Sequence, residues 1–129
     1  MVKNNILLDT HVFIWAMEKN NRLSSDIQDM LTSPTTSIFI SVASVWEIVI
    51  KKAKKKLKIS QDIEAGIKKA KFTILPLEIA HVLAVENLPL HHQDPFDRVL
   101  LAQAKIESLS LITADKKMWR YKTIDIIKV

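Results

Sequence analysis

The chain has no cysteine, a single glycine and no long apolar run, and each scarcity excludes a class of protein. Without cysteine there is no disulfide framework, no thiolate zinc site and no cysteine nucleophile, which fits a reducing cytoplasm. The lone Gly66 excludes a Walker loop and a G-x-G-x-x-G dinucleotide turn, because both need several glycines. No apolar run approaches the roughly 18 to 20 residues of a membrane span, and the start of the chain is charged too soon for a signal peptide. We therefore expect a cytoplasmic protein without a membrane anchor.

The composition predicts one globular domain with a basic surface. A length of 129 residues fits a single domain, residues 1–129, and an apolar content of 48% is enough for a core. The formal net charge is +5 and the isoelectric point about 9.5, so polyanions are plausible partners.

Short apolar strands alternate with helices along the whole chain. We expect strands at residues 5–8, 37–40, 72–75, 109–113 and 123–129, and helices at 11–17, 24–33, 41–56, 60–71, 78–86 and 94–107. This alternation predicts an α/β fold with a parallel sheet and helices on both faces, the last strand lying at an edge. In such sheets, ligands bind at the carboxyl ends of the strands.

The most informative stretch is residues 93–104, which begins a helix and carries acid at its start. Asp94 is a good N-cap and Pro95 fits the first helical position. Asp97 falls in the first turn, where a carboxylate meets the positive end of the helix dipole. Taken alone, both acids are explained as helix caps.

Three more acids follow or lie near strand ends. Asp9 follows the first strand, Asp115 follows the fourth, and Glu47 lies within the helix after the second strand. Singly, each has an ordinary explanation: helix capping for the aspartates, and a surface ion pair with Lys51 for Glu47. Together with Asp97 they can converge on one rim of the sheet. Converging carboxylates repel one another, and a hard divalent cation such as Mg²⁺ or Mn²⁺ relieves that repulsion.

The helix at 41–56 carries two further features. Its apolar residues Val42, Trp46 and Val49 repeat at helical spacing, which predicts that this stripe faces the core. Beyond Glu47 comes a lysine-rich run. Such a run is usually a solvated face, but beside an acidic site it can hold a nucleic-acid backbone; the candidates are Lys51, Lys54, Lys55 and Lys58. The loop histidines His91 and His92 are possible metal ligands, although solvated or capping roles are commoner.

Four sequence blocks resemble the PIN-domain nucleases, and within them the VapC-type toxins of bacterial toxin–antitoxin pairs. The blocks are residues 7–11 (LLDTH), 44–48 (SVWEI), 94–104 (DPFDRVLLAQA) and 111–115 (LITAD). The resemblance implies a PIN-like three-layer sandwich with a five-stranded parallel sheet, and an endoribonuclease that hydrolyses phosphodiesters with a water activated by Mg²⁺ or Mn²⁺. It assigns the metal and the catalysis to Asp9, Glu47, Asp97 and Asp115.

The same resemblance gives Thr113 a supporting hydroxyl role. Asp94 and Arg98 belong to the third block but not to the four acids, and we assign Asp94 to helix capping and Arg98 to a structural ion pair. Ala114 departs from many relatives because it lacks an amide, which affects the contacts near Asp115. The implied partners are an RNA substrate, a small antitoxin whose tail crosses the active cleft, and a second copy of the chain.

Two other functions remain open at this point. The chain can be a non-catalytic basic α/β module that binds RNA or a protein and keeps its acids as caps. An aspartyl phosphatase is the weaker alternative, because that chemistry usually needs a second acid two residues after Asp9, where this chain has His11.

Overall fold

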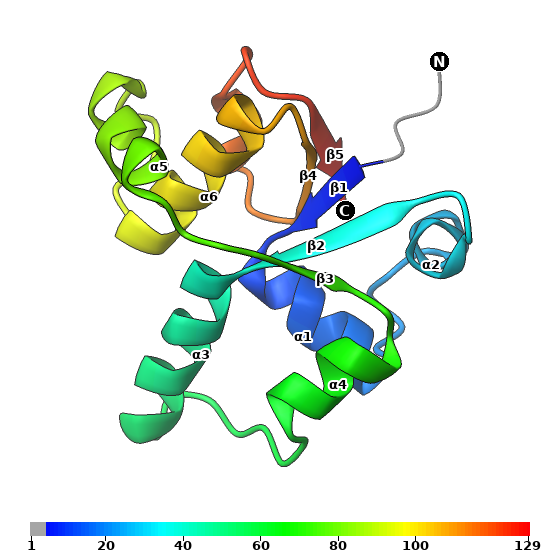
Figure 1. Cartoon of the computed structure of the whole chain (residues 1–129). Coiled ribbons are helices and arrows are strands. Elements are labelled where there is room, and N and C mark those ends of the chain that lie inside the picture. The colour runs from blue at the N-terminus through cyan, green and yellow to red at the C-terminus, as the bar shows by residue number, and fades with distance from the viewer. Residues whose placement is uncertain (1–4) are drawn as a thin grey trace.

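The computed structural model describes residues 5–129, so the expectation about the start of the chain falls partly on residues 1–4, outside the described part. All five strands form one parallel sheet in the order β3-β2-β1-β4-β5 (Figure 1). The strands are β1 (Asn5–Leu8), β2 (Ser37–Ser41), β3 (Thr73–Leu75), β4 (Ser110–Thr113) and β5 (Ile126–Lys128). The predicted parallel sheet and its edge position for the last strand are confirmed.

The helices occupy the two faces of this sheet (Figure 1). They are α1 (Thr10–Glu18), α2 (Ser25–Thr32), α3 (Val42–Ala53), α4 (Ile63–Lys69), α5 (Ile79–Ala84) and α6 (Pro95–Ile106), with 3-10 turns η1 (Val85–Asn87) and η2 (Met118–Arg120). No helix within residues 5–129 combines the length and the apolar character that a membrane crossing requires.

Alternating side chains of β1 divide the core into two layers. Ile6 and Leu8 point to one face, where they join the cores of α1, α2 and α4. Leu7 points to the other face and packs with Leu100 and Leu101 of α6. Since successive residues of a strand face opposite sides, a strand buried on both faces is apolar throughout. The three-layer sandwich therefore follows directly from the NILL sequence of β1.

The register of the sheet determines which residues lie side by side where the strands end at its carboxyl edge. Leu8 pairs with Ile112 of β4, and Leu7 pairs with Phe39 of β2. The next positions, Asp9 and Thr113, therefore come level with each other as their strands end. This edge is where the acids gather.

The prediction for α3 is wrong in two respects. The helix ends at Ala53 and not at Lys56, and the apolar stripe faces outward, with Val42 43%, Trp46 56% and Val49 55% exposed. The buried residues of α3 are Ala43, Ser44, Glu47 and Ile48. α3 packs against both α1 and α6.

Candidate active site

Asp9 occupies the point where β1 passes into α1, and it is almost fully buried. Its Oδ1 accepts a hydrogen bond of 2.8 Å from the amide of Val12, which makes it the N-cap of α1. Its Oδ2 accepts a short hydrogen bond from the hydroxyl of Thr113. Burial raises the pKa of Asp9 above its usual value, an effect only partly offset by these two hydrogen bonds, and the charge of Asp115 adds to it. Asp9 is therefore a cap whose second oxygen faces the other acids.

Thr113 links two of the predicted acids. Its hydroxyl donates to Asp9 and accepts a hydrogen bond of 3.0 Å from the backbone N–H of Asp115. The same hydroxyl therefore orients one carboxylate and positions the segment that carries the other. Asp115 also caps its own turn, since its Oδ1 accepts from the amide of Lys117 at 2.9 Å.

Glu47 is buried, with 3% of its surface exposed, so its ion pair is not the surface pair that sequence alone suggests. Oε1 accepts a hydrogen bond of 2.7 Å from the hydroxyl of Thr10, and Oε2 lies 2.6 Å from Lys51 Nζ. The hydrogen bond that Lys51 donates to Glu47 raises the pKa of Lys51, and the charges of Asp94 and Asp97 raise it further. Lys51 thus belongs to the acid cluster and compensates part of its negative charge.

Asp97 is the electrostatic centre of the cluster. The pKa of its carboxyl is raised from 3.8 to about 7, first by burial and then by the negative charges of Asp94 and Glu47. The charge of Asp9 acts in the same direction, while His92 opposes it. Contacts also connect the acids: Thr113 hydrogen-bonds both Asp9 and the amide of Asp115, and the ring of His92 lies 2.8 Å from Asp97 and 2.9 Å from Asp115.

Asp94 has the capping role expected of it. Its Oδ1 accepts a hydrogen bond of 3.0 Å from the amide of Asp97, and Pro95 occupies the first turn of α6. It contributes charge to the cluster, but one of its two oxygens is engaged by the helix.

His92 is the residue that sequence reasoning undervalued. Its ring Nε2 lies 2.8 Å from Asp97 Oδ2 and 2.9 Å from Asp115 Oδ2, and the residue is only 8% exposed. Two adjacent histidines in a loop show no hydrophobic periodicity, so the sequence did not indicate that one of them is buried. Its neighbour His91 is exposed, as the sequence suggests for a loop.

Arg98 does not form the predicted ion pair. Within residues 5–129 its guanidinium meets no carboxylate and instead donates to main-chain carbonyls, including Val85 at 2.9 Å and Pro89 at 3.0 Å. It also reaches the carbonyl of His92 at 3.1 Å. Arg98 is therefore the buried centre around which the loop carrying His92 folds.

The lysines beyond α3 do not form a row along one helix. Lys54 is the C-cap of α3, Lys55 has the left-handed φ of 57°, and Lys58 lies in the following loop. All three are exposed, unlike Lys51. The expected cationic track is thus a turn and loop of solvated lysines at the end of α3 away from Ser41.

A comparison with known protein families identifies the family to which this chain belongs. The PIN domain family matches residues 6–124, which is nearly the full chain. The chain belongs to the PIN domain family. Among curated protein sequences, no match was found.

Solved structures resemble this PIN domain over almost its entire length. A chain of VapBC2 from Rickettsia felis, bound to a promoter DNA fragment, superposes with a TM-score of 0.72 at 15% identity, covering 96% of this chain and 98% of that one. DNA-bound VapBC from Salmonella typhimurium gives 0.67 at 16% identity, covering 99% and 98%. VapBC-1 from nontypeable Haemophilus influenzae gives 0.63 at 20% identity, covering 96% and 97%. At these identities the likeness establishes the shared fold.

The donor set of this PIN domain fits a divalent cation. Asp9 and Asp97 are carboxyls with raised pKa values, and His11, His92 and the Lys51 ion pair with Glu47 oppose the negative charge only in part. Such a site is electrostatically unsatisfied without a cation, and oxygen donors suit Mg²⁺ and Mn²⁺. In the part of the chain that the structure describes, Asp97 and Asp115 offer such donors together with His92, and the donor atoms of these three residues lie within 4.8 Å of one another.

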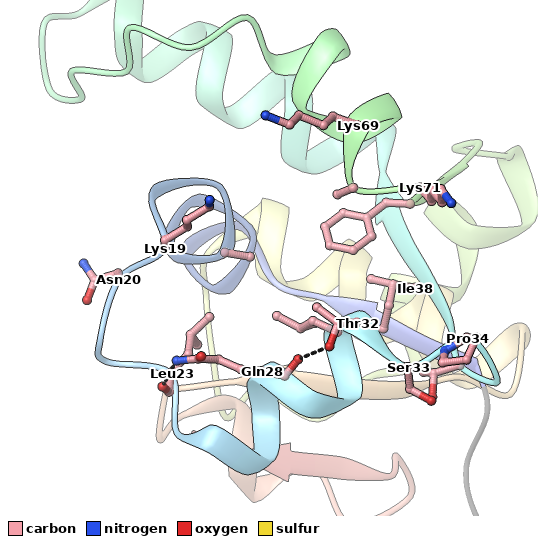
Figure 2. Close-up of a pocket in the computed structure, with 15 residues that line it drawn as sticks. Lys19, Asn20, Leu23, Gln28, Thr32, Ser33, Pro34, Ile38, Lys69 and Lys71 are labelled. Carbon is pink, nitrogen blue, oxygen red and sulfur yellow. Dashed lines mark hydrogen bonds between the residues drawn. The ribbon is translucent and has the colours of Figure 1, made fainter.

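A cavity of about 830 Å³ lies elsewhere in the PIN domain, between the end of α1, α2 and the end of α4 (Figure 2). Lys19, Lys69 and Lys71 lie around it, and Ile38 near the start of β2 lines it. It shares no residue with the acid cluster, which lies at the carboxyl ends of the strands. The cavity therefore takes no part in the chemistry of the acids.

Proposed function

We propose that the protein is a divalent-metal-dependent endoribonuclease and the toxin of a toxin–antitoxin pair. The observation that carries the proposal is the gathering of acids around Asp97, whose pKa is raised to about 7 by burial and by its acidic neighbours. Membership of the PIN domain family supports a nuclease-type hydrolase. Asp9, Glu47, Asp97 and Asp115 hold the cation in this proposal.

A cation bound there would lower the pKa of a water molecule and neutralise charge on the scissile phosphate. The chain supplies the positioning. Thr113 holds Asp9, and Thr10 and Lys51 hold the two oxygens of Glu47. Without the ion, burial and acidic neighbours raise the pKa of Asp97 to about 7, and a bound cation would favour its ionised form.

The exposed lysines near the end of α3 suit contacts with RNA phosphates. Lys54, Lys55 and Lys58 are exposed, and cationic side chains of this kind supply affinity without reading sequence. Lys51, committed to Glu47, serves the site itself in this proposal.

A small antitoxin is the protein partner we propose. The structural neighbours named above are VapBC toxin–antitoxin complexes or parts of them. An acidic cleft attracts a basic side chain, so an antitoxin tail that places arginine or lysine among the acids would occupy the position of the cation.

We further propose that two copies of the chain associate. The outward faces of α3 and α5 carry large exposed apolar side chains, unusual for a protein that acts alone. They are Val42, Trp46, Val49, Ile79, Val82 and Leu83. Both helices pack against α6, and Trp46 stacks edge-on against Phe96 of α6 at 5.4 Å.

Replacement of Leu83, which is 61% exposed, should break this association. A charge buried in an apolar interface is unfavourable, so Leu83→Glu is expected to convert a dimer to a monomer in light scattering after size exclusion. Leu90→Glu is the matched control, because Leu90 is 80% exposed but lies in a loop. A wild-type monomer, or a Leu83→Glu dimer, would contradict the proposed interface.

The proposed activity is tested with purified protein free of antitoxin. We expect it to cut RNA internally in Mn²⁺ or Mg²⁺, to stop in excess chelator, and to resume when the ion is restored. Sequencing the new RNA ends would establish internal cleavage. Persistent cutting in chelator would contradict the role of the metal. No cutting, with no heat on calorimetric titration of Mn²⁺, would support a non-catalytic basic module instead.

A further inference from the structure

His92 stands between two of the carboxylates proposed to hold the cation. Its Nε2 lies 2.8 Å from Asp97 Oδ2 and 2.9 Å from Asp115 Oδ2. Donor atoms of these three residues all lie within 4.8 Å of one another, and no other such group of three was found in residues 5–129. A cation bound by both aspartates is therefore within reach of an imidazole nitrogen.

The position of His92 is built by contacts from distant parts of the chain. Its backbone N–H donates to the hydroxyl of Tyr121 at 3.1 Å, and its carbonyl accepts from Arg98 at 3.1 Å. Tyr121 in turn donates to the carbonyl of Pro89 at 2.7 Å. Both main-chain groups of His92 are thus held, and the ring is directed into the acid cluster. A merely solvated loop histidine needs no such support.

One neutral tautomer of the ring satisfies all three of its contacts. With the hydrogen on Nε2, Nδ1 accepts a long contact of 3.4 Å from the amide of Asp94, and Nε2 faces Asp97 and Asp115. A hydrogen bond of that length is weak. Moving the hydrogen to Nδ1 therefore loses little, and it exposes the Nε2 lone pair to a cation between the aspartates.

We propose that Nε2 of His92 is a ligand of the divalent cation, together with Asp97 and Asp115, and that this nitrogen makes the site prefer Mn²⁺ over Mg²⁺. The proposal rests on the cation requirement of the proposed function. Mg²⁺ is held almost entirely by oxygen. Mn²⁺ also takes oxygen ligands, but as a first-row transition metal it accepts an imidazole nitrogen more readily than Mg²⁺ does. A donor set of two carboxylates and one imidazole thus favours Mn²⁺ over Mg²⁺.

The direct test is spectroscopic and needs no variant. Mn²⁺ is added to the whole wild-type protein without RNA, and pulsed electron paramagnetic resonance is used to detect magnetic coupling to a ligand nitrogen. We expect a ¹⁴N coupling that becomes a ¹⁵N coupling when the protein is made with ¹⁵N-labelled histidine. Bound Mn²⁺ without a histidine coupling would overturn the proposal.

A variant pair tests the consequence for ion preference. In calorimetric titrations, His92→Asn is expected to lose about 10- to 100-fold in Mn²⁺ affinity, by comparison with the loss of other groups at metal sites, and to change less toward Mg²⁺. Gln93→Asn, at the exposed residue on the other side of His92, should match the wild type. An unchanged preference would overturn the proposal, and tighter Mn²⁺ binding by His92→Asn would also overturn it by showing that the ring competes with the ion. A wild type that binds no divalent cation would instead contradict the proposed function.

Discussion

Asp97→Asn is expected to reduce RNA cleavage by at least roughly 100-fold, since even groups that only support a metal ligand are worth about 10- to 100-fold. The asparagine keeps the size and one oxygen of the side chain but removes the charge at the centre of the cluster. The fold should survive, because the helix cap is supplied by Asp94 and not by Asp97. Cleavage kinetics with saturating Mn²⁺, beside a circular dichroism spectrum, measure both expectations.

The same variant should be more stable than the wild type when no metal is present. The pKa of Asp97 is about 7 in the folded protein and near 3.8 in the unfolded chain. Between those values the unfolded chain has released the proton that the folded protein retains. The stability that this group contributes is therefore present below about pH 4 and is lost as the pH rises through 7. In chelator at pH 8, we expect Asp97→Asn to raise the free energy of unfolding by about 1–3 kcal/mol.

Denaturant unfolding at pH 5, 6.5 and 8 in chelator checks the sign. The difference between the two proteins should grow with pH and shrink when Mn²⁺ is added, because the ion stabilises only the protein that binds it well. Asp29→Asn is the matched control, an exposed aspartate of α2 outside the cluster. An Asp97→Asn protein that cleaves RNA at the wild-type rate would remove Asp97 from the site. One that is less stable at pH 8 would contradict the repulsion argument.

Most of the fold could be read from local pattern because the strands are buried on both faces. The apolar triplets Ile6–Leu8 and Ile38–Ile40 show no alternation with polar residues, as expected where helices cover both sides of a strand. The carboxyl-edge position of Asp9 and Asp115 then follows from topology. The acids could be predicted to converge for that reason, although their role in binding metal remains a prediction.

Hydrophobic periodicity gave the wrong buried face where packing against other elements decides which side chains are buried. In α3 the most apolar stripe, which includes Trp46 and Val49, faces outward, while small residues and Glu47 face inward. Periodicity identifies a stripe but does not say whether it meets the core or a partner. The burial of His92 was missed for a related reason. Its burial depends on Arg98 and Tyr121, and no local signal marks that dependence.

Arg98→Met is expected to destabilise the protein by about 3 kcal/mol or more, because several enclosed carbonyls lose their donor together. The guanidinium is only 8% exposed and donates to the carbonyls of Val85, Leu88, Pro89 and His92 at 2.9 to 3.3 Å. Methionine fills much of the same volume but donates nothing. Denaturant unfolding measures the loss. Arg120→Met, an exposed arginine of η2, should change stability by less than about 0.5 kcal/mol.

The loop that Arg98 holds also carries His92 into the acid cluster, so the variant should affect the site before the whole protein unfolds. Hydrogen exchange is expected to show faster exchange across residues 85–92 in Arg98→Met, while the strands remain protected. The exchange rate of Arg98→Lys across this loop should lie between those of the wild type and Arg98→Met. An ammonium keeps the charge but lacks the planar fork that reaches several carbonyls at once. If Arg98→Met proved as stable as the Arg120→Met control, the carbonyls of this loop would have to be satisfied by water, and the loop would not depend on the arginine.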